Sequence, residues 1–172
     1  MDIKVVPLDY LAQMRLAEKL AYPGMAGDWW KDTLHAASVR EIDGVEVPKP
    51  SSEVHIRDII RRLDDDGMAY VQAEHFKYRE PGDPPAYVVK KLNALERWDL
   101  KRMANQFWNI PAWASVAYMA CMVRSVDAAA LGFPKDLDEL YARVKTMGVH
   151  GLGAAARALR PEPKEDEDAD AG

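Results

Sequence analysis

The 172-residue chain is poor in cysteine, because Cys121 is the only one. A disulfide framework and a four-cysteine zinc site are therefore excluded. Long apolar runs are also missing, since residues 112–123 fall short of the about 20 residues that span a bilayer. The first residues lack the basic and apolar regions of a secretory signal. We therefore expect a cytoplasmic protein that does not insert into a membrane.

An excess of positive charge is missing too. The chain has 23 Lys and Arg against 28 Asp and Glu, and the acidic segment 161–172 accounts for the whole net charge of −5. Because the remaining body is neutral, the composition does not favour binding to a phosphate backbone, and we expect no nucleic-acid partner. The segment 161–172 is also proline-rich and lacks large apolar side chains. It is predicted to be a disordered tail after a folded body, residues 1–160.

Helical periodicity recurs along most of the body. Asp9, Asp28 and Ser51 or Ser52 are the expected N-caps of three helices. Pro111 suits the first turn of another helix, where an N–H group is not required. Gly67 is predicted to end a helix as a left-handed C-cap. The predicted helices cover residues 10–21, 28–37, 52–66, 68–76, 87–97, 99–107, 111–123, 137–147 and 152–159.

One β-hairpin is predicted at Val39–Val47. Asp43-Gly44 separates two alternating segments, and both turn residues tolerate the positive φ that a tight hairpin needs. A lone hairpin is marginal in water, so this one must pack on helices or pair with another chain. The sequence therefore predicts a mainly α fold, a compact helical domain with one short hairpin. We find no internal repeat, and the proline-rich loop 77–86 leaves a division into two subdomains open.

The sequence offers no set of residues typical of catalysis or of metal and cofactor binding. Asp64, Asp65 and Asp66 are consecutive, whereas an EF-hand loop alternates its acids. The four histidines have no i, i+4 pair, and no Gly-x-Ser-x-Gly elbow is present. Cys121 lies in an apolar segment that favours an inert, buried thiol. An enzyme would have to use groups that are dispersed along the sequence, of which His75, Glu74 and Tyr78 are the leading candidates. We expect no enzymatic activity.

Five tryptophans are the most informative side chains. Trp29 and Trp30 are adjacent at a helix start, so they point to different sides, and either can be in the core or at a contact. Aromatic side chains fill cores but are also enriched in binding hot spots. We interpret Trp98, Trp108 and Trp113 first as core residues. The hypothesis for a partner-binding surface nevertheless includes the hairpin and the helix face near residues 108–113. Its residues are Trp29, Trp30, Ile42, Val45, Trp108 and Trp113.

The order of motifs resembles a known family. Ile42-Asp43-Gly44-Val45, followed by Pro48 and Pro50, precedes a helix that reads Arg62-Leu63-Asp64-Asp65-Asp66-Gly67. Over residues 1–76 this resembles the tail assembly chaperones of long-tailed bacteriophages. The resemblance implies a small, helix-rich, non-enzymatic protein that binds the tape measure protein and tail-tube subunits during assembly. It provides no active-site residue to transfer.

A second interpretation fits the same composition. A small phage-encoded inhibitor or regulatory protein that acts by protein–protein binding would also be acidic and without catalytic residues. The genes beside it would separate the two, because a chaperone gene lies between those of the tube and the tape measure. The aromatic and methionine content is also compatible with a homo-oligomer.

Overall fold

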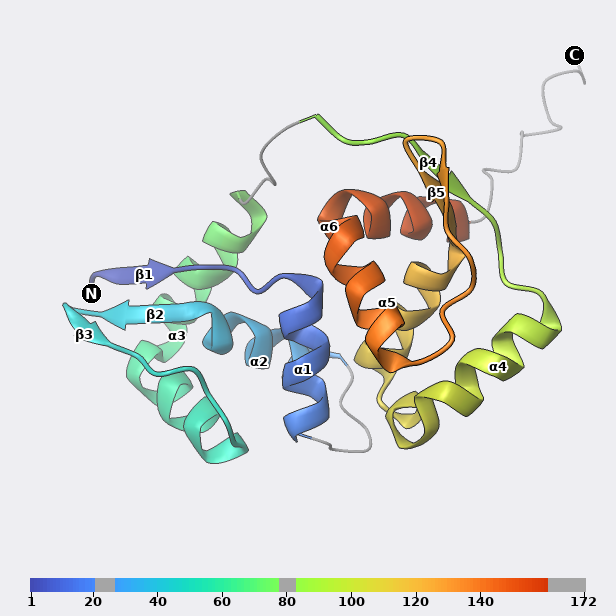
Figure 1. The fold of residues 1–172 in the computed structure, drawn as a ribbon. Helices are drawn as coiled ribbons and strands as arrows, with labels where there is room; N and C mark the ends of the chain where they lie inside the picture. Colours follow the sequence, from blue (N-terminus) through green and yellow to red (C-terminus); the bar gives the residue numbers. More distant parts are fainter. Residues whose placement is uncertain (21–26, 78–82, 161–172) are drawn as a thin grey trace, which may run out of the picture.

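The computed structural model describes residues 1–20, 27–77 and 83–160 (Figure 1). Helices dominate it, with two small three-stranded sheets, so the predicted mainly α fold is confirmed. The described helices include none with the length and hydropathy needed to cross a bilayer. The predicted tail 161–172, the centre of the loop 77–86 and the helix stop at Tyr22-Pro23-Gly24 lie outside the described residues.

The first half of the chain contains one sheet and three helices. β1 pairs with β2, and β2 with β3, both antiparallel, with Ile3 opposite Ile42 and Ile42 opposite Val45. The predicted hairpin is thus confirmed, and the N-terminal strand completes its sheet. The elements are β1 (Ile3–Val5), α1 (Tyr10–Leu20), α2 (Asp28–Ser38), β2 (Val39–Ile42), β3 (Val45–Glu46) and α3 (Glu53–Lys77).

The second half contains another sheet of the same topology. Tyr87 lies opposite Val126, and Val126 lies opposite Ala129. This second hairpin was not predicted. The elements are β4 (Tyr87–Val89), α4 (Ala94–Ala104), a 3₁₀ helix η1 (Asn105–Asn109), α5 (Pro111–Met122), β5 (Val123–Val126), β6 (Ala129–Ala130) and α6 (Leu137–Leu159).

The two halves form an internal repeat with a constant offset of 84 positions. β1 begins at Ile3 and β4 at Tyr87, while α1 begins at Tyr10 and α4 at Ala94. The strand registers repeat with the same offset. Each of the two ladders has an irregularity, between Lys4 and Val5 in the first and between Val88 and Val89 in the second. The expectation that the chain has no internal repeat is therefore wrong.

The hairpin turns repeat in their backbone geometry as well. Asp43 and Gly44 have φ of 48° and 77°, and Asp127 and Ala128 have φ of 46° and 66°. The Asp2 N–H donates to Asp43 Oδ1 at 2.7 Å, and the Ala86 N–H donates to Asp127 Oδ1 at 2.9 Å. The aspartate thus ties the first strand to the turn in both halves.

Helix caps recur in the same way. Asp9 Oδ1 accepts from the Ala12 N–H at 2.7 Å, and Asn93 Oδ1 accepts from the Glu96 N–H at 2.9 Å. The caps predicted at Asp9 and at Ser52 are confirmed. Asp28 is not a cap, because the N-cap of α2 is Gly27 and Asp28 lies within the first turn. Its carboxylate there still faces the positive end of the helix dipole.

The last helix of each half is kinked. Asp64 breaks α3 with φ of 53°, and Gly148 breaks α6 with φ of 52°. Gly67 is therefore not the predicted left-handed C-cap, and it has no positive φ. Its role is close approach, because a Cβ there would lie 3.2 Å from Met1 Sδ and 3.1 Å from Leu63 Cβ.

The predicted helices 87–97 and 99–107 are wrong in their boundaries. Residues 87–89 form β4, because this short Tyr-Val-Val segment pairs with β5 and a strand suits aromatic and β-branched residues. α4 then runs unbroken through Asp99, capped by Asn93. The prediction at Pro111 is confirmed, because Pro111 begins α5.

The buried side chains form two clusters. Val39, Ile56 and Leu63 belong to the cluster of α2 and α3, and Trp113 and Leu140 belong to the cluster of α5 and α6. α1 lies between α2 and the pair α5–α6 (Figure 1) and contacts both α5 and α6. A helix of the first repeat is therefore packed onto the second.

Candidate functional site

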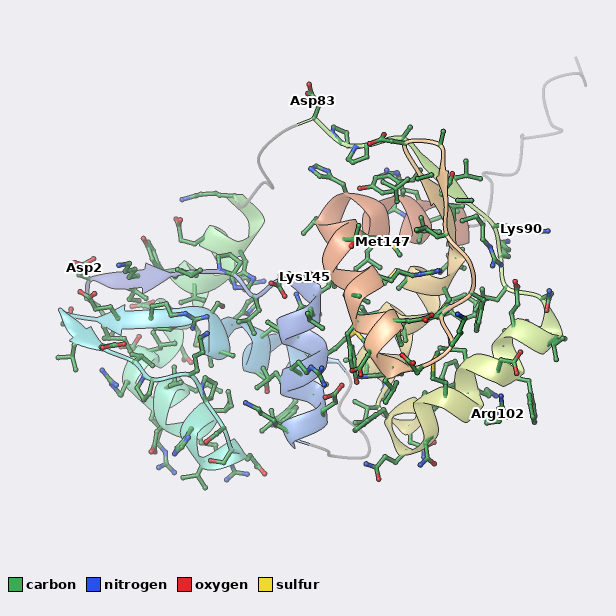
Figure 2. All side chains as sticks on the ribbon, viewed as in Figure 1. Asp2, Asp83, Lys90, Arg102, Lys145 and Met147 are labelled. Atoms are coloured by element: carbon green, nitrogen blue, oxygen red, sulfur yellow. The ribbon has the colours of Figure 1, made fainter. Side chains whose placement is uncertain are left out.

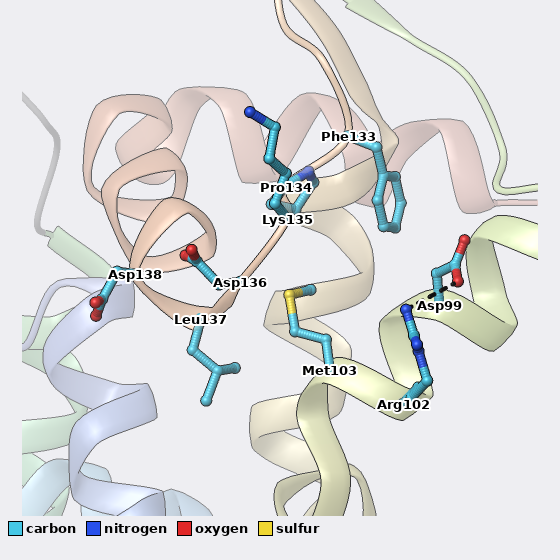
Figure 3. Close-up of a pocket in the computed structure, with 9 residues that line it drawn as sticks. All are labelled: Asp99, Arg102, Met103, Phe133, Pro134, Lys135, Asp136, Leu137 and Asp138. Carbon is cyan, nitrogen blue, oxygen red and sulfur yellow. Dashed lines mark ion pairs between the residues drawn. The ribbon is translucent and has the colours of Figure 1, made fainter.

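A groove with a volume of about 960 Å³ runs between α4 and the segment that leads into α6. Met103, Phe133 and Leu137 supply its apolar part, and the side chains of Met103 and Leu137 reach into the space between the two elements (Figure 3). The other residues that line it are Asp99, Arg102, Pro134, Lys135, Asp136 and Asp138.

The rim of this groove carries both signs of charge. Arg102 Nη2 lies 3.8 Å from Asp99 Oδ1, and Lys135 Nζ lies 3.9 Å from Glu139 Oε1. Asp136 is committed to the helix, because its Oδ1 accepts from the Glu139 N–H at 2.9 Å. An apolar strip with a mixed charged rim suits the face of an amphipathic helix or an extended peptide. Among the described residues, the groove lining contains no Ser, Thr, Cys or His to act as nucleophile or imidazole base.

The first repeat has a counterpart of this groove. A pocket of about 220 Å³ beside α1 is lined by Arg15, Lys19, Lys49 and Pro50, among others. With the offset of 84, Lys19 corresponds to Met103 and Lys49 to Phe133. Two lysines of the first repeat are thus replaced by apolar side chains in the second. Met103 and Phe133 thus give the second groove apolar side chains at two positions where the first repeat has lysine.

The leading candidate for acid–base chemistry is a pair at the ends of α2 and α3. Ser38 Oγ lies 2.5 Å from His75 Nε2, and burial, followed by the neighbouring His35, lowers the pKa of His75 to about 4. The Ser38 hydroxyl is 0% exposed and also lies within hydrogen-bond distance of the Leu34 and His35 carbonyl oxygens. The Ser38 side chain is therefore closed to solvent, while His75 is half-buried, and the contact links the ends of α2 and α3.

The other proposed catalytic partners are placed differently. Glu74 forms an ion pair with Lys77 at 2.6 Å, and Tyr78 lies outside the described residues. Cys121 is buried, as predicted, and burial raises the pKa of its thiol to about 12. Within residues 1–20, 27–77 and 83–160, no three His, Cys, Asp or Glu side chains gather where they could hold a metal ion.

The residues predicted for a partner surface do not form one patch. Ile42 and Trp113 are buried in the two cores, and Trp30 is half-buried against both. Trp29 is 38% exposed. Val45 is exposed on the edge strand β3, and Trp108 is half-buried with Lys101 Nζ 5.4 Å from its ring centre.

Trp98 was predicted to lie in the core, and this is wrong. It is 59% exposed on α4, where the Arg102 guanidinium lies 5.3 Å from its ring centre. Figure 2 shows Arg102 on α4 at the margin of the molecule. Leu100 and Ala104 mark the buried face of α4 at i, i+4 spacing, and Trp98 is out of step with them. That spacing was a signal for an exposed tryptophan.

Comparisons with protein-family models, with curated proteins and with solved structures found no match to this chain. Its function therefore has to be inferred from its own residues and surfaces.

Proposed function

We propose that the chain is a tail assembly chaperone of a long-tailed bacteriophage, which binds the tape measure protein and tail-tube subunits and catalyses no reaction. The observation that carries the proposal is the groove between α4 and α6, with its apolar part of Met103, Phe133 and Leu137. The motif order at Ile42–Val45 and Arg62–Gly67 supports the choice of family.

The groove fits the client that this function requires. The tape measure protein of this family is long and rich in helix, and an amphipathic helix binds by placing its apolar face in such a groove. The charged side chains of both signs on the rim, Arg102 and Asp138 among them, can pair with the polar flanks of the helix.

The edge strand β3 offers a second contact for a client. Val45 is exposed, and β3 is the last strand in the order β1-β2-β3. An extended segment of a tube subunit can add to such an edge through main-chain hydrogen bonds. An assembly factor with a helix groove and a strand edge can hold two kinds of subunit at once.

The test is co-purification from the native source at moderate salt, with partners identified by mass spectrometry. We expect a very long, helix-rich protein together with a tube-forming subunit. A Met103→Lys, Phe133→Lys double variant should lose the long protein. The first repeat has lysine at the two equivalent positions, Lys19 and Lys49, so the double variant should still fold. Circular dichroism can verify this.

The matched control is Lys49→Phe, which makes the opposite exchange in the pocket of the first repeat. This variant should retain both partners. Retention of the long protein by the groove variant would assign its binding to another surface. Recovery of a host nuclease or transcription component in place of tail proteins would refute the chaperone proposal in favour of the inhibitor.

A further inference from the structure

α1 makes the contact that joins the two repeats. Met14 and Ala17 belong to the core cluster of the second repeat. Glu18 Oε1 accepts from Trp113 Nε1 at 2.9 Å and from the Tyr141 hydroxyl. The Arg15 guanidinium lies 3.8 Å from the centre of the Tyr141 ring. One face of α1 is therefore built to fit a surface on α5 and α6.

α4 is the repeat equivalent of α1, and the same face of it is uncovered. Met14 is 1% exposed, whereas its equivalent Trp98 is 59% exposed. Leu95, the equivalent of Leu11, is 67% exposed. On the opposite face, the two helices have the same burial. Leu16 of α1 and Leu100 of α4 are each buried in the core of their own repeat. Only the side that would contact a following repeat lacks a partner element in the described structure.

The surface that receives α1 also has an equivalent, on α2 and α3 of the first repeat. Trp113 is 0% exposed under α1, and its equivalent Trp29 is 38% exposed. Buried Tyr141 corresponds to the exposed Arg57. The exposed face of α4 (the projecting face) and the surface around Arg57 and Ile60 (the receiving face) are thus the repeat equivalents of the two surfaces that meet where α1 packs on α5 and α6.

We propose that the exposed face of α4 docks on α2 and α3 of a second copy of this chain, as α1 docks on α5 and α6 within one copy. The contact is head-to-tail, so both copies keep one unused surface, and the assembly grows into a ring or an open helical chain. The proposal rests on the internal repeat and not on the identity of a client. Asp99 and Arg102 also line the groove, so a docked copy covers part of its rim.

Several side chains at the equivalent positions can pair by charge. Asp99 takes the place of Arg15, and Arg57 takes the place of Tyr141, so a carboxylate meets a guanidinium. Arg102 takes the place of Glu18, and Trp29 takes the place of Trp113. A cation–π contact between Arg102 and Trp29 would therefore replace the Glu18–Trp113 hydrogen bond. The apolar centre is Leu95 and Trp98 on one side and the half-buried Ile60 on the other.

Sedimentation velocity of the full chain at increasing concentration tests the proposal. We expect reversible growth beyond the dimer as the concentration rises toward about 1 mM. A Trp98→Glu variant lacks the projecting face, and an Arg57→Glu, Ile60→Glu variant lacks the receiving face. Each should sediment as a monomer. Val88→Glu, at an exposed valine of β4, is the control and should assemble like the parent.

Mixing the two monomeric variants gives the decisive result. One intact α4 face and one intact receiving face remain in the mixture, so a 1:1 dimer should form and grow no further. A parent chain that stays monomeric to about 1 mM would overturn the proposal. So would self-association of the receiving-face variant alone, because that would mean that α4 pairs with α4. Circular dichroism and thermal melting of each variant separate lost assembly from lost folding.

Discussion

Asp64 and Gly148 stand at equivalent positions of the two repeats and break their helices with the same backbone conformation. Their φ values are 53° and 52°, and their ψ values are −170° and −155°. This region is open to glycine and strained for other residues. Asp64 compensates in part, because its Oδ1 accepts from the Gly67 N–H at 3.0 Å. The kink is therefore a property of the fold that the two repeats reach with different residues.

Replacing Gly148 by alanine should destabilise the protein. The Cβ meets the unfavourable backbone region, and we expect a loss of about 1–3 kcal/mol in the free energy of unfolding. Urea denaturation followed by circular dichroism measures it. Gly153→Ala is the control in the same helix, because Gly153 has a helical backbone and the nearest atom, Arg157 Nη1, would lie 3.7 Å from its Cβ. That variant should gain up to about 1 kcal/mol from helix propensity. Equal effects at both glycines would contradict a strained kink.

The elements predicted from the sequence are those with strong local signals. Asp9, Ser52 and Pro111 mark helix starts by hydrogen-bonding and steric rules that act within one turn. The Asp43-Gly44 turn marked the first hairpin. The second hairpin lacks that signal, because Ala128 replaces the glycine and β6 is Ala129-Ala130. Its strands form through pairing with β4, which local propensity does not reveal.

The repeat was hidden because few residues are shared between the halves. Val39-Arg40 with Asp43 recurs as Val123-Arg124 with Asp127, and this shared spacing was the sequence signal of the repeat. Most other equivalent positions share only their backbone conformation or their burial. Met14 and Trp98 share the helical conformation alone, because Met14 is buried and Trp98 is exposed. The groove was not predictable for another reason. It joins α4 to the segment around Phe133, and no periodicity connects residues so far apart in the chain.

Glu18 should be the most important charged residue of the contact between the repeats. Its carboxylate accepts from the indole of Trp113 and from the hydroxyl of Tyr141, both on buried residues. Glu18→Ala leaves these donors without an acceptor, and we expect a loss of about 1–3 kcal/mol in the free energy of unfolding. Glu18→Gln keeps an acceptor and should lose less.

Glu53→Ala provides the comparison for Glu18. Glu18 pairs with Arg15 at 3.1 Å and Glu53 pairs with Arg57 at 2.7 Å, but in the second pair both side chains are exposed. An exposed ion pair contributes little, so this variant should unfold at the same urea concentration as the parent. If the Glu18 variant behaved like the Glu53 variant, α1 would be held to the second repeat by apolar packing alone.

His75 should make the protein less stable in mild acid. Its pKa is about 4 in the folded protein against 6.5 ordinarily, because burial and the nearby His35 disfavour the charged ring. Between these values the unfolded chain binds more protons, so stability rises with pH across this window and falls on acidification. The ring is only half-buried, and solvent screening reduces the expected loss between pH 7 and pH 4 to about 1 kcal/mol.

A His75→Gln variant isolates this contribution. Glutamine keeps a polar partner for Ser38 and does not titrate, so the difference in unfolding free energy between pH 7 and pH 4 should shrink relative to the parent. His55→Gln is the control, because His55 is an exposed histidine of the same helix and its removal should leave the difference as it was. Comparing each variant with the parent cancels the titration of the carboxylates. An unchanged difference in the His75 variant would mean that protonation of the His75 ring does not lower the free energy of unfolding.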